Sequence, residues 1–280
     1  MPAIVENLVL PAGLATLEVS LVAGLSAVTA AYAASPMKLL TPVARGQSVW
    51  ACTSSFGGGL VAGDQTRLEL RAGKNTRCFF GTQASTKIYR NAGLRACSHV
   101  TTAALGENSR LVFAPDPVQP FTQSRYAQRQ EFRLAAGAGL ALVDWFSSGR
   151  VARGERWAFN RFQSRNEVFL SGERIFLDAL SLDAADGLLA SPHVTGRFNC
   201  FALLLLVGEP MQAAVAHLLA ESATLPVSRG AKLIASASAI PQGAVLRLAG
   251  EELEAVGREL HRQLSFTCDF LGDDPWARKW

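Results

Sequence analysis

Alternation of apolar and polar residues dominates the first two thirds of the chain. Leu17, Val19 and Leu21 alternate with polar neighbours, and the same two-residue period recurs over 66–71 and 125–134. A period of two is typical of β-strands that bury one face. We therefore expect strands over 15–23 and 39–55, a half-exposed antiparallel strand over 125–134, and a hairpin formed by 157–170 and 174–183.

The pattern changes beyond Pro192. A nearly uninterrupted apolar run over 198–207 predicts a strand buried on both faces, and a helix is expected to follow over 209–223. A hairpin over 233–248 and a last helix over 251–264 complete the chain. Many strands followed by late helices predict a mainly β fold with two α-helices in the C-terminal third. No internal repeat is apparent, and we expect a single domain over 1–280 with a flexible arm at about 272–280.

Composition and charge exclude several classes of partner. Hydrophobic residues make up 49% of the chain and charged residues 18%, which is rather apolar for a soluble monomer and would be explained by a surface that partners cover. The net charge is +4 and the arginines are scattered, so we expect no nucleic-acid binding. The apolar run 201–207 is far shorter than the roughly 20 residues that span a bilayer, so we expect no membrane partner.

The cysteines and histidines indicate a reducing compartment and no stable metal site. Five cysteines, an odd number without a C-x-x-C pair, are typical of reduced thiols in the cytoplasm. The four histidines lie far apart in sequence, and no second histidine or cysteine stands three or four residues after His217 in the expected helix. We expect a cytoplasmic protein with no tightly bound cofactor.

The least generic stretch lies at 53–90. Four glycines, Gly57, Gly58, Gly59 and Gly63, lie within seven positions and precede Asp64, which predicts a sharp bend of the backbone. A nucleotide-binding loop is excluded because an aspartate and a glutamine stand where the lysine and hydroxyl of a phosphate loop belong. The residues that follow alternate as a strand, whereas a dinucleotide site needs a helix there.

This stretch carries a family resemblance. The glycine element at 56–64 and the run Thr82-Gln83-Ala84-Ser85-Thr86-Lys87-Ile88-Tyr89-Arg90 are similar to two motifs of the urease accessory protein D family, also called UreD or UreH. Ala62 departs from the motif, which usually has glycine there. The resemblance covers most of the chain and implies a flattened, β-helix-like stack of strands with two helices.

The resemblance also implies a function. Members of the family are scaffolds in the assembly of the urease nickel centre; they bind the F accessory protein and, through it, the G accessory GTPase. That assembly docks on apo-urease, and an internal passage through the D protein is part of the proposed nickel route. A transit site needs weak oxygen ligands rather than a tight cage, because it must release its ion. We therefore expect only transient Ni²⁺ binding.

Two carboxylates are our candidates for the nickel path. Asp64 belongs to the matched motif, and Asp178 interrupts an otherwise apolar strand. The remaining motif residues are expected to be structural or to contact partners, since threonine and glutamine satisfy an opened backbone and tyrosine and arginine anchor interfaces. They are Gly58, Gly59, Gly63, Thr82, Gln83, Thr86, Lys87, Tyr89, Arg90 and, in a second loop, Glu155.

An enzyme remains the alternative. The chain has no G-x-S-x-G and no H-E-x-x-H motif, but residues distant in sequence can still meet in space. On this hypothesis, a β-rich enzyme would bind a small molecule in a cleft where Asp64 and Glu155 converge. Their separation in the fold discriminates between the two hypotheses.

Overall fold

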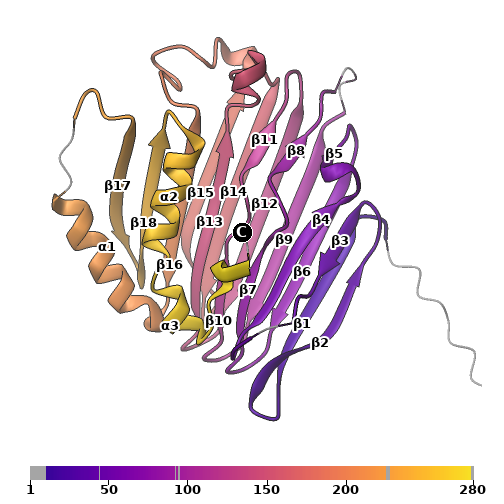
Figure 1. Ribbon diagram of the computed structural model, residues 1–280, viewed down its shortest axis with the longest axis vertical. Coiled ribbons are helices and arrows are strands. Elements are labelled where there is room, and N and C mark those ends of the chain that lie inside the picture. The colour runs from indigo at the N-terminus through magenta and orange to yellow at the C-terminus, as the bar shows by residue number, and fades with distance from the viewer. Residues whose placement is uncertain (1–10, 44, 92, 94, 225–227, 279–280) are drawn as a thin grey trace, which may run out of the picture.

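Two β-sheets lie face to face in the computed structural model, which describes residues 11–43, 45–91, 93, 95–224 and 228–278 (Figure 1). Sheet A has seven strands in the order β15-β14-β12-β9-β6-β1-β2. Sheet B has eleven, and its main path runs β17-β18-β16-β13-β10-β7-β4-β3. The strands of sheet A are β1 (Leu14–Val22), β2 (Leu25–Ala33), β6 (Gln65–Ala72), β9 (Cys97–Leu105), β12 (Arg125–Leu134), β14 (Arg161–Leu170) and β15 (Glu173–Asp183).

The chain passes repeatedly from one sheet to the other and so winds a β-solenoid of about four turns. This confirms the mainly β, stacked architecture expected from the sequence. The strands of sheet B on the main path are β3 (Met37–Leu40), β4 (Val49–Ser55), β7 (Arg77–Thr82), β10 (Arg110–Phe113), β13 (Gly139–Ser147), β16 (Cys200–Val207), β17 (Leu233–Ile240) and β18 (Gly243–Gly250); the short strands β5 (Gly59–Leu60), β8 (Thr86–Ile88) and β11 (Val118–Pro120) lie beside them.

Strand direction is where the sequence prediction fails. The strand predicted as antiparallel over 125–134 is β12, which pairs in parallel with both β9 and β14. Each turn of a solenoid returns to the same sheet in the same direction, so β1, β6, β9, β12 and β14 are parallel, and only the hairpin partners β2 and β15 at the two edges of sheet A run antiparallel. Alternation in the sequence reports which face is buried and not which way the neighbouring strand runs.

The main core fills the space between the sheets. Phe132 and Leu70 from sheet A meet Phe80, Phe113 and Leu140 from sheet B, and the exposed fraction of each side chain is 3% or less. Phe113 stacks on Phe80 and meets Phe132 edge to face, with ring centroids 5.2 and 5.3 Å apart. The alternating strands thus bury their apolar faces against one another.

The α-helices pack on the outer face of sheet B (Figure 1). The two predicted late helices are present as α1 (Gln212–Thr224) and α2 (Leu253–Gln263), and a short third helix, α3 (Thr267–Leu271), was not predicted. The first helix was expected to begin at Glu209; residues Glu209–Met211 instead form a 3₁₀ turn that contains Pro210. None of the helices described is long and apolar enough to cross a membrane. The outer face of sheet A carries none of the described α-helices.

The C-terminal segment, predicted as an arm, contacts the body of the molecule as far as the structure describes it. The Trp276 ring lies edge-on to Phe79 at 5.2 Å and donates a hydrogen bond from Nε1 to the Thr267 hydroxyl at 2.9 Å. The Asp273 carboxylate accepts a hydrogen bond from the Gly46 backbone at 3.0 Å. These contacts join the end of the chain to its first third. Its mobility in solution stays a prediction.

Candidate functional site: a polar row inside the solenoid

A row of polar side chains interrupts the apolar interior. Parallel pairing places equivalent positions of successive strands side by side, so one inward residue from each turn joins the row. The first register row on sheet A contains Thr66, His99, Gln128 and Ser164, and the row beside it contains Thr101, Gln130, Asn166 and Asp178. Apart from His99 and Asp178, which are half-buried, these side chains are buried.

Asp144 on β13 reaches this row from the opposite sheet. Its Oδ1 accepts a hydrogen bond from Gln128 Nε2 at 2.6 Å, and its Oδ2 accepts from Ser164 Oγ at 2.6 Å and Asn166 Nδ2 at 2.8 Å. All three donors are neutral, and within the described part of the chain no basic side chain forms an ion pair with Asp144. Asp144 is half-buried, and a partly desolvated carboxylate that only neutral donors hold favours the approach of a cation.

The electrostatic environment of Asp144 also favours a nearby cation. Burial raises the pKa of the Asp144 carboxyl above its ordinary value, the three hydrogen bonds oppose that rise, and the nearby Asp178 carboxylate adds to it. A divalent cation beside Asp144 would offset both unfavourable effects. Asp144 was not among the residues predicted from the sequence. It lies in an apolar strand, Gly139–Ser147, and so carries the same signal that had drawn attention to Asp178.

Two cavities meet at Asp144. The first, of about 100 Å³, is also lined by Thr82, Thr86 and His99. The second, of about 270 Å³, is lined by Ser164, Asp178 and Arg247. Asp178 is half-buried at the second cavity, where its Oδ1 pairs with Nη2 of the exposed Arg247 at 2.7 Å and links sheet A to sheet B. No group of three or more metal-ligating side chains occurs among the residues described.

The glycine element forms a turn at the rim of the solenoid. Gly57, Gly58 and Gly63 have φ between 71 and 87°, the left-handed region that favours glycine. The Asp64 carboxylate accepts a hydrogen bond from the Val61 backbone at 2.9 Å and so closes the turn. Asp64 is half-buried and lines neither of the two cavities. Its contacts fit a residue that organises the bend, and its part in a nickel path stays a prediction.

The second motif ties this turn to its neighbours. The Tyr89 hydroxyl donates to the Gly57 carbonyl at 2.6 Å, and Arg90 Nε donates to Gln123 Oε1 at 2.8 Å. Thr82 donates to the Asp116 carboxylate at 3.0 Å and accepts from the Asp116 backbone at 2.7 Å. These contacts give the motif a structural role. Thr86 is half-buried, and the side chains of Gln83 and Lys87 are exposed, so these two remain open to a partner.

The two carboxylates of the enzyme hypothesis are held in separate turns. Glu155 accepts hydrogen bonds from Arg150 Nε at 2.9 Å and from the Thr122 backbone at 3.2 Å. The Arg150 hydrogen bond lowers the pKa of Glu155. Neither Glu155 nor Asp64 lines the two interior cavities. The contacts of each are local, and no cavity described above brings the pair together.

Fold and interior together define a β-solenoid protein with a polar, cation-compatible row through its core. The chain belongs to the family of UreD urease accessory proteins, whose family model matches residues 12–280. It is 44% identical to "Urease accessory protein UreD" of Sorangium cellulosum over 96% of this chain and 85% of that protein. It is 38% identical to the UreD protein of an Anaeromyxobacter species over 96% of this chain and 90% of the relative. "Urease accessory protein D" of Arabidopsis thaliana is 31% identical over 91% of this chain and 97% of its own length.

Proposed function

We propose that this chain is an assembly scaffold in urease maturation. It binds the F accessory protein and, through it, the G accessory GTPase, docks on apo-urease, and conveys Ni²⁺ through its interior. Membership of the UreD family supports the maturation role. The observation that carries the nickel route is the half-buried Asp144 carboxylate, which neutral donors hold where two cavities meet.

The polar row suits an ion in transit. Neighbouring strands lie about 4.8 Å apart, so each turn of the solenoid offers the next ligand within reach of a hydrated cation. Hydroxyl and amide oxygens bind Ni²⁺ weakly, and one carboxylate with one imidazole makes no closed coordination shell. Asp144 attracts the ion, and the hydroxyl and amide oxygens replace some of the ion's water ligands. Because these contacts are weak, the ion can leave toward Asp178.

The cytoplasm is the compartment that we propose for this work. Cys52, Cys78, Cys97, Cys200 and Cys268 are all free thiols. Burial raises the pKa of Cys78 to about 12, so its thiol is protonated and unreactive at neutral pH. Reduced thiols fit a reducing environment.

The experiment that tests the route is Asp144→Asn. We expect it to leave the accessory complex intact while nickel loading falls about tenfold, because the amide keeps the shape of the side chain but removes its negative charge. The chain would be co-expressed with the F and G accessory proteins and apo-urease. The complex is then measured by size exclusion, and nickel per active site and urea hydrolysis are measured on the purified urease. Glu107→Gln, an exposed partner of Lys74, is the matched control.

Two further variants separate the roles of the predicted carboxylates. Asp178→Asn should also lower nickel loading, whereas Asp64→Ala separates a path role from a structural one. Lower loading with an intact complex places Asp64 on the path, and loss of partner binding assigns it to the bend. Wild-type nickel loading in both Asp144→Asn and Asp178→Asn would refute the interior route. Urease activation that proceeds equally without this chain would refute the scaffold itself.

A further inference from the structure

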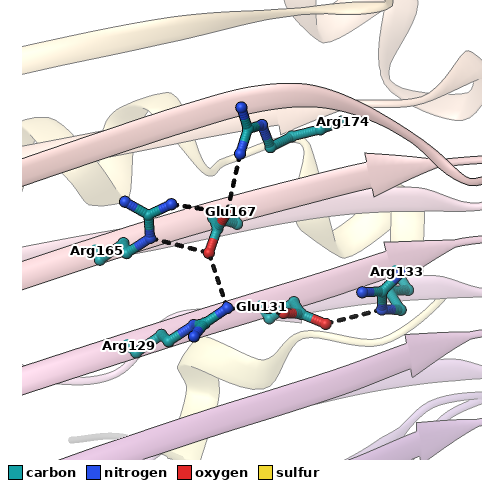
Figure 2. A network of polar contacts seen from close by, with 6 residues as sticks. All are labelled: Arg129, Glu131, Arg133, Arg165, Glu167 and Arg174. Atoms are coloured by element: carbon teal, nitrogen blue, oxygen red, sulfur yellow. Dashed lines mark hydrogen bonds and ion pairs between the residues drawn. The ribbon is translucent and has the colours of Figure 1, made fainter.

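The outer face of sheet A carries a network of ion-paired arginines and glutamates that is not part of the proposed nickel route. Figure 2 shows its centre, in which four arginines and two glutamates project from neighbouring strands: Arg129, Glu131 and Arg133 on β12, Arg165 and Glu167 on β14, and Arg174 on β15. Parallel pairing sets Arg129 beside Arg165 and Glu131 beside Glu167. The charges therefore lie in rows across the strands.

Glu167 lies at the centre of this network and pairs with three arginines. Arg165 binds it through two nitrogens, each at 3.0 Å. Arg129 Nη2 lies 3.2 Å from the same carboxylate and Arg174 Nη1 lies 3.4 Å from it, as Figure 2 shows. The hydrogen bonds from Arg165 lower the pKa of Glu167, so the carboxylate stays charged. Three guanidinium groups are thus held in fixed positions around one anion.

The two signs of charge differ in their exposure. The Glu167 side chain is 4% exposed and the Glu131 side chain 19%, because the arginines cover them. The exposed fractions of the arginine side chains lie between 41 and 57%. A partner that approaches this part of the sheet therefore meets guanidinium groups, while the compensating carboxylates lie beneath.

The N-terminal end of the same face provides a contrast. Arg67 pairs with Glu69 and Arg71 with Glu18, but those carboxylates are 37 and 46% exposed. Both signs reach solvent there, and the surface is a neutral mosaic. The cationic character is confined to β12, β14 and β15, which we call the arginine face (Arg129, Arg133, Arg165 and Arg174).

We propose that the arginine face is a docking surface for a carboxylate-rich surface of a partner protein; this inference rests on the proposed scaffold function. Guanidinium groups bind carboxylates through paired hydrogen bonds, and side chains already aligned by Glu167 and Glu131 lose little entropy on binding. Protein is favoured over nucleic acid as the partner because the cationic patch is confined to three strands. Leu177, which lies beside Glu167 in register and is 42% exposed, adds an apolar contact. A phosphate backbone needs an unbroken cationic track.

The test variant is Arg133→Gln with Arg174→Gln. It removes two guanidinium groups but leaves Arg165 and Arg129 on Glu167, so the buried carboxylate stays paired. Arg67→Gln with Arg71→Gln is the matched control, because it removes the same charge from the other end of the same sheet. Thermal unfolding by circular dichroism confirms that both variants fold.

Binding is measured by fluorescence anisotropy and biolayer interferometry with the full-length chain. The probes are a peptide of eight glutamates, its glutamine counterpart, a 12-base-pair DNA duplex, and apo-urease and the F and G accessory proteins one at a time. We expect the glutamate peptide and one assembly component to bind the test variant about tenfold more weakly than the wild type, at roughly threefold per lost guanidinium. The control variant should bind both like the wild type.

Normal binding of every component by the test variant would overturn this inference, and so would any of three other outcomes. They are equal losses in the two variants, binding of the glutamine peptide as tight as that of the glutamate peptide, and DNA binding tighter than peptide binding that depends on Arg133 and Arg174. The docking surface and the scaffold function can be refuted independently of each other. If urease activation still depends on the chain while the test variant binds every component normally, the docking surface is refuted and the scaffold stands.

Discussion

The imidazole of His99, in the polar row, is uncharged. His99 Nδ1 lies 2.8 Å from the Thr66 hydroxyl and its Nε2 lies 3.1 Å from the Thr101 hydroxyl. A hydroxyl can donate or accept, so the neutral ring satisfies both of its nitrogens. Burial lowers the pKa of His99 to about 4. The row is therefore polar but uncharged except at its carboxylates, which leaves them as the groups that attract a cation.

His99 predicts a pH dependence of stability with a definite sign. Its folded-state pKa lies below the ordinary value of 6.5, so the unfolded chain binds the proton first. The stability is complete above pH 6.5 and is lost as the pH falls toward 4. Between pH 7 and 5 we expect a loss of about 2 kcal/mol from this group. Urea unfolding of wild type and His99→Asn at both pH values measures it, since the variant should lack this part of the slope.

The exposed histidine His217 supplies the control, because His217→Asn alters a side chain that is 78% exposed. Its pH slope should match that of the wild type. Asp144 acts in the opposite direction, since burial raises its pKa and protonation on acidification relieves a buried charge. A difference of less than a few tenths of a kcal/mol between wild type and His99→Asn would show that the ring is not desolvated.

Of the two carboxylates that line the second cavity, Asp178 was predicted from the sequence and Asp144 was not. Asp178 was noticed because apolar neighbours flank it, and Asp144 has equally apolar neighbours. No local sequence pattern contains the register between turns of the solenoid. That register places Asn166 beside Asp178 and brings Gln128 and Ser164 within hydrogen-bond distance of Asp144. A polar residue in an apolar strand can be predicted to be special, but its partners come from other turns.

At the scale of the element, the glycine turn shows two different uses of glycine. Gly57 has a φ of 77° and open space where a Cβ would lie, whereas Gly59 is extended, and a Cβ there would lie 2.3 Å from the Lys87 carbonyl oxygen. Gly57 serves the bend, and Gly59 serves the close packing of β5 against β8. The sequence predicted the bend but could not show which glycine served which purpose.

Alanine at each position separates the two uses. Gly57→Ala should cost about 1 kcal/mol of unfolding free energy through its left-handed backbone. Gly59→Ala should cost roughly 2–3 kcal/mol, because the backbone of β8 must move. Urea unfolding at neutral pH measures both. Equal costs, or a larger cost at Gly57, would contradict this assignment of roles.

Hairpins were the elements best predicted from sequence. The pairs β14 with β15 and β17 with β18 both occur where a turn signal joined two apolar runs. The parallel strands were predicted in place but not in direction. A hairpin is specified by residues close in sequence, whereas a parallel neighbour arrives after a complete turn of the solenoid.

The whole molecule is a structural repeat without a sequence repeat. Equivalent positions of four successive strands hold Thr66, His99, Gln128 and Ser164, which share polarity but neither size nor identity. Their common property is that each must satisfy a hydrogen bond in the interior. No self-similarity appears in the sequence because the fold requires only this property, and the family motifs, rather than the residue periodicity, identified the stack.

The C-terminal segment determines whether the two ends of the chain stabilise one another. Asp273 contacts Gly46 and Trp276 packs on Phe79, so residues beyond α3 bind the first turns of the solenoid. A chain that ends at Leu271 should lose roughly 2–3 kcal/mol of unfolding free energy, mainly from exposing the Trp276 contact surface. Trp276→Ala should account for most of that loss, and a chain that ends at Arg278 retains both contacts and is the control. Unfolding of the shortened chain at the same urea concentration as the wild type would instead show that the segment is the free arm predicted from its sequence.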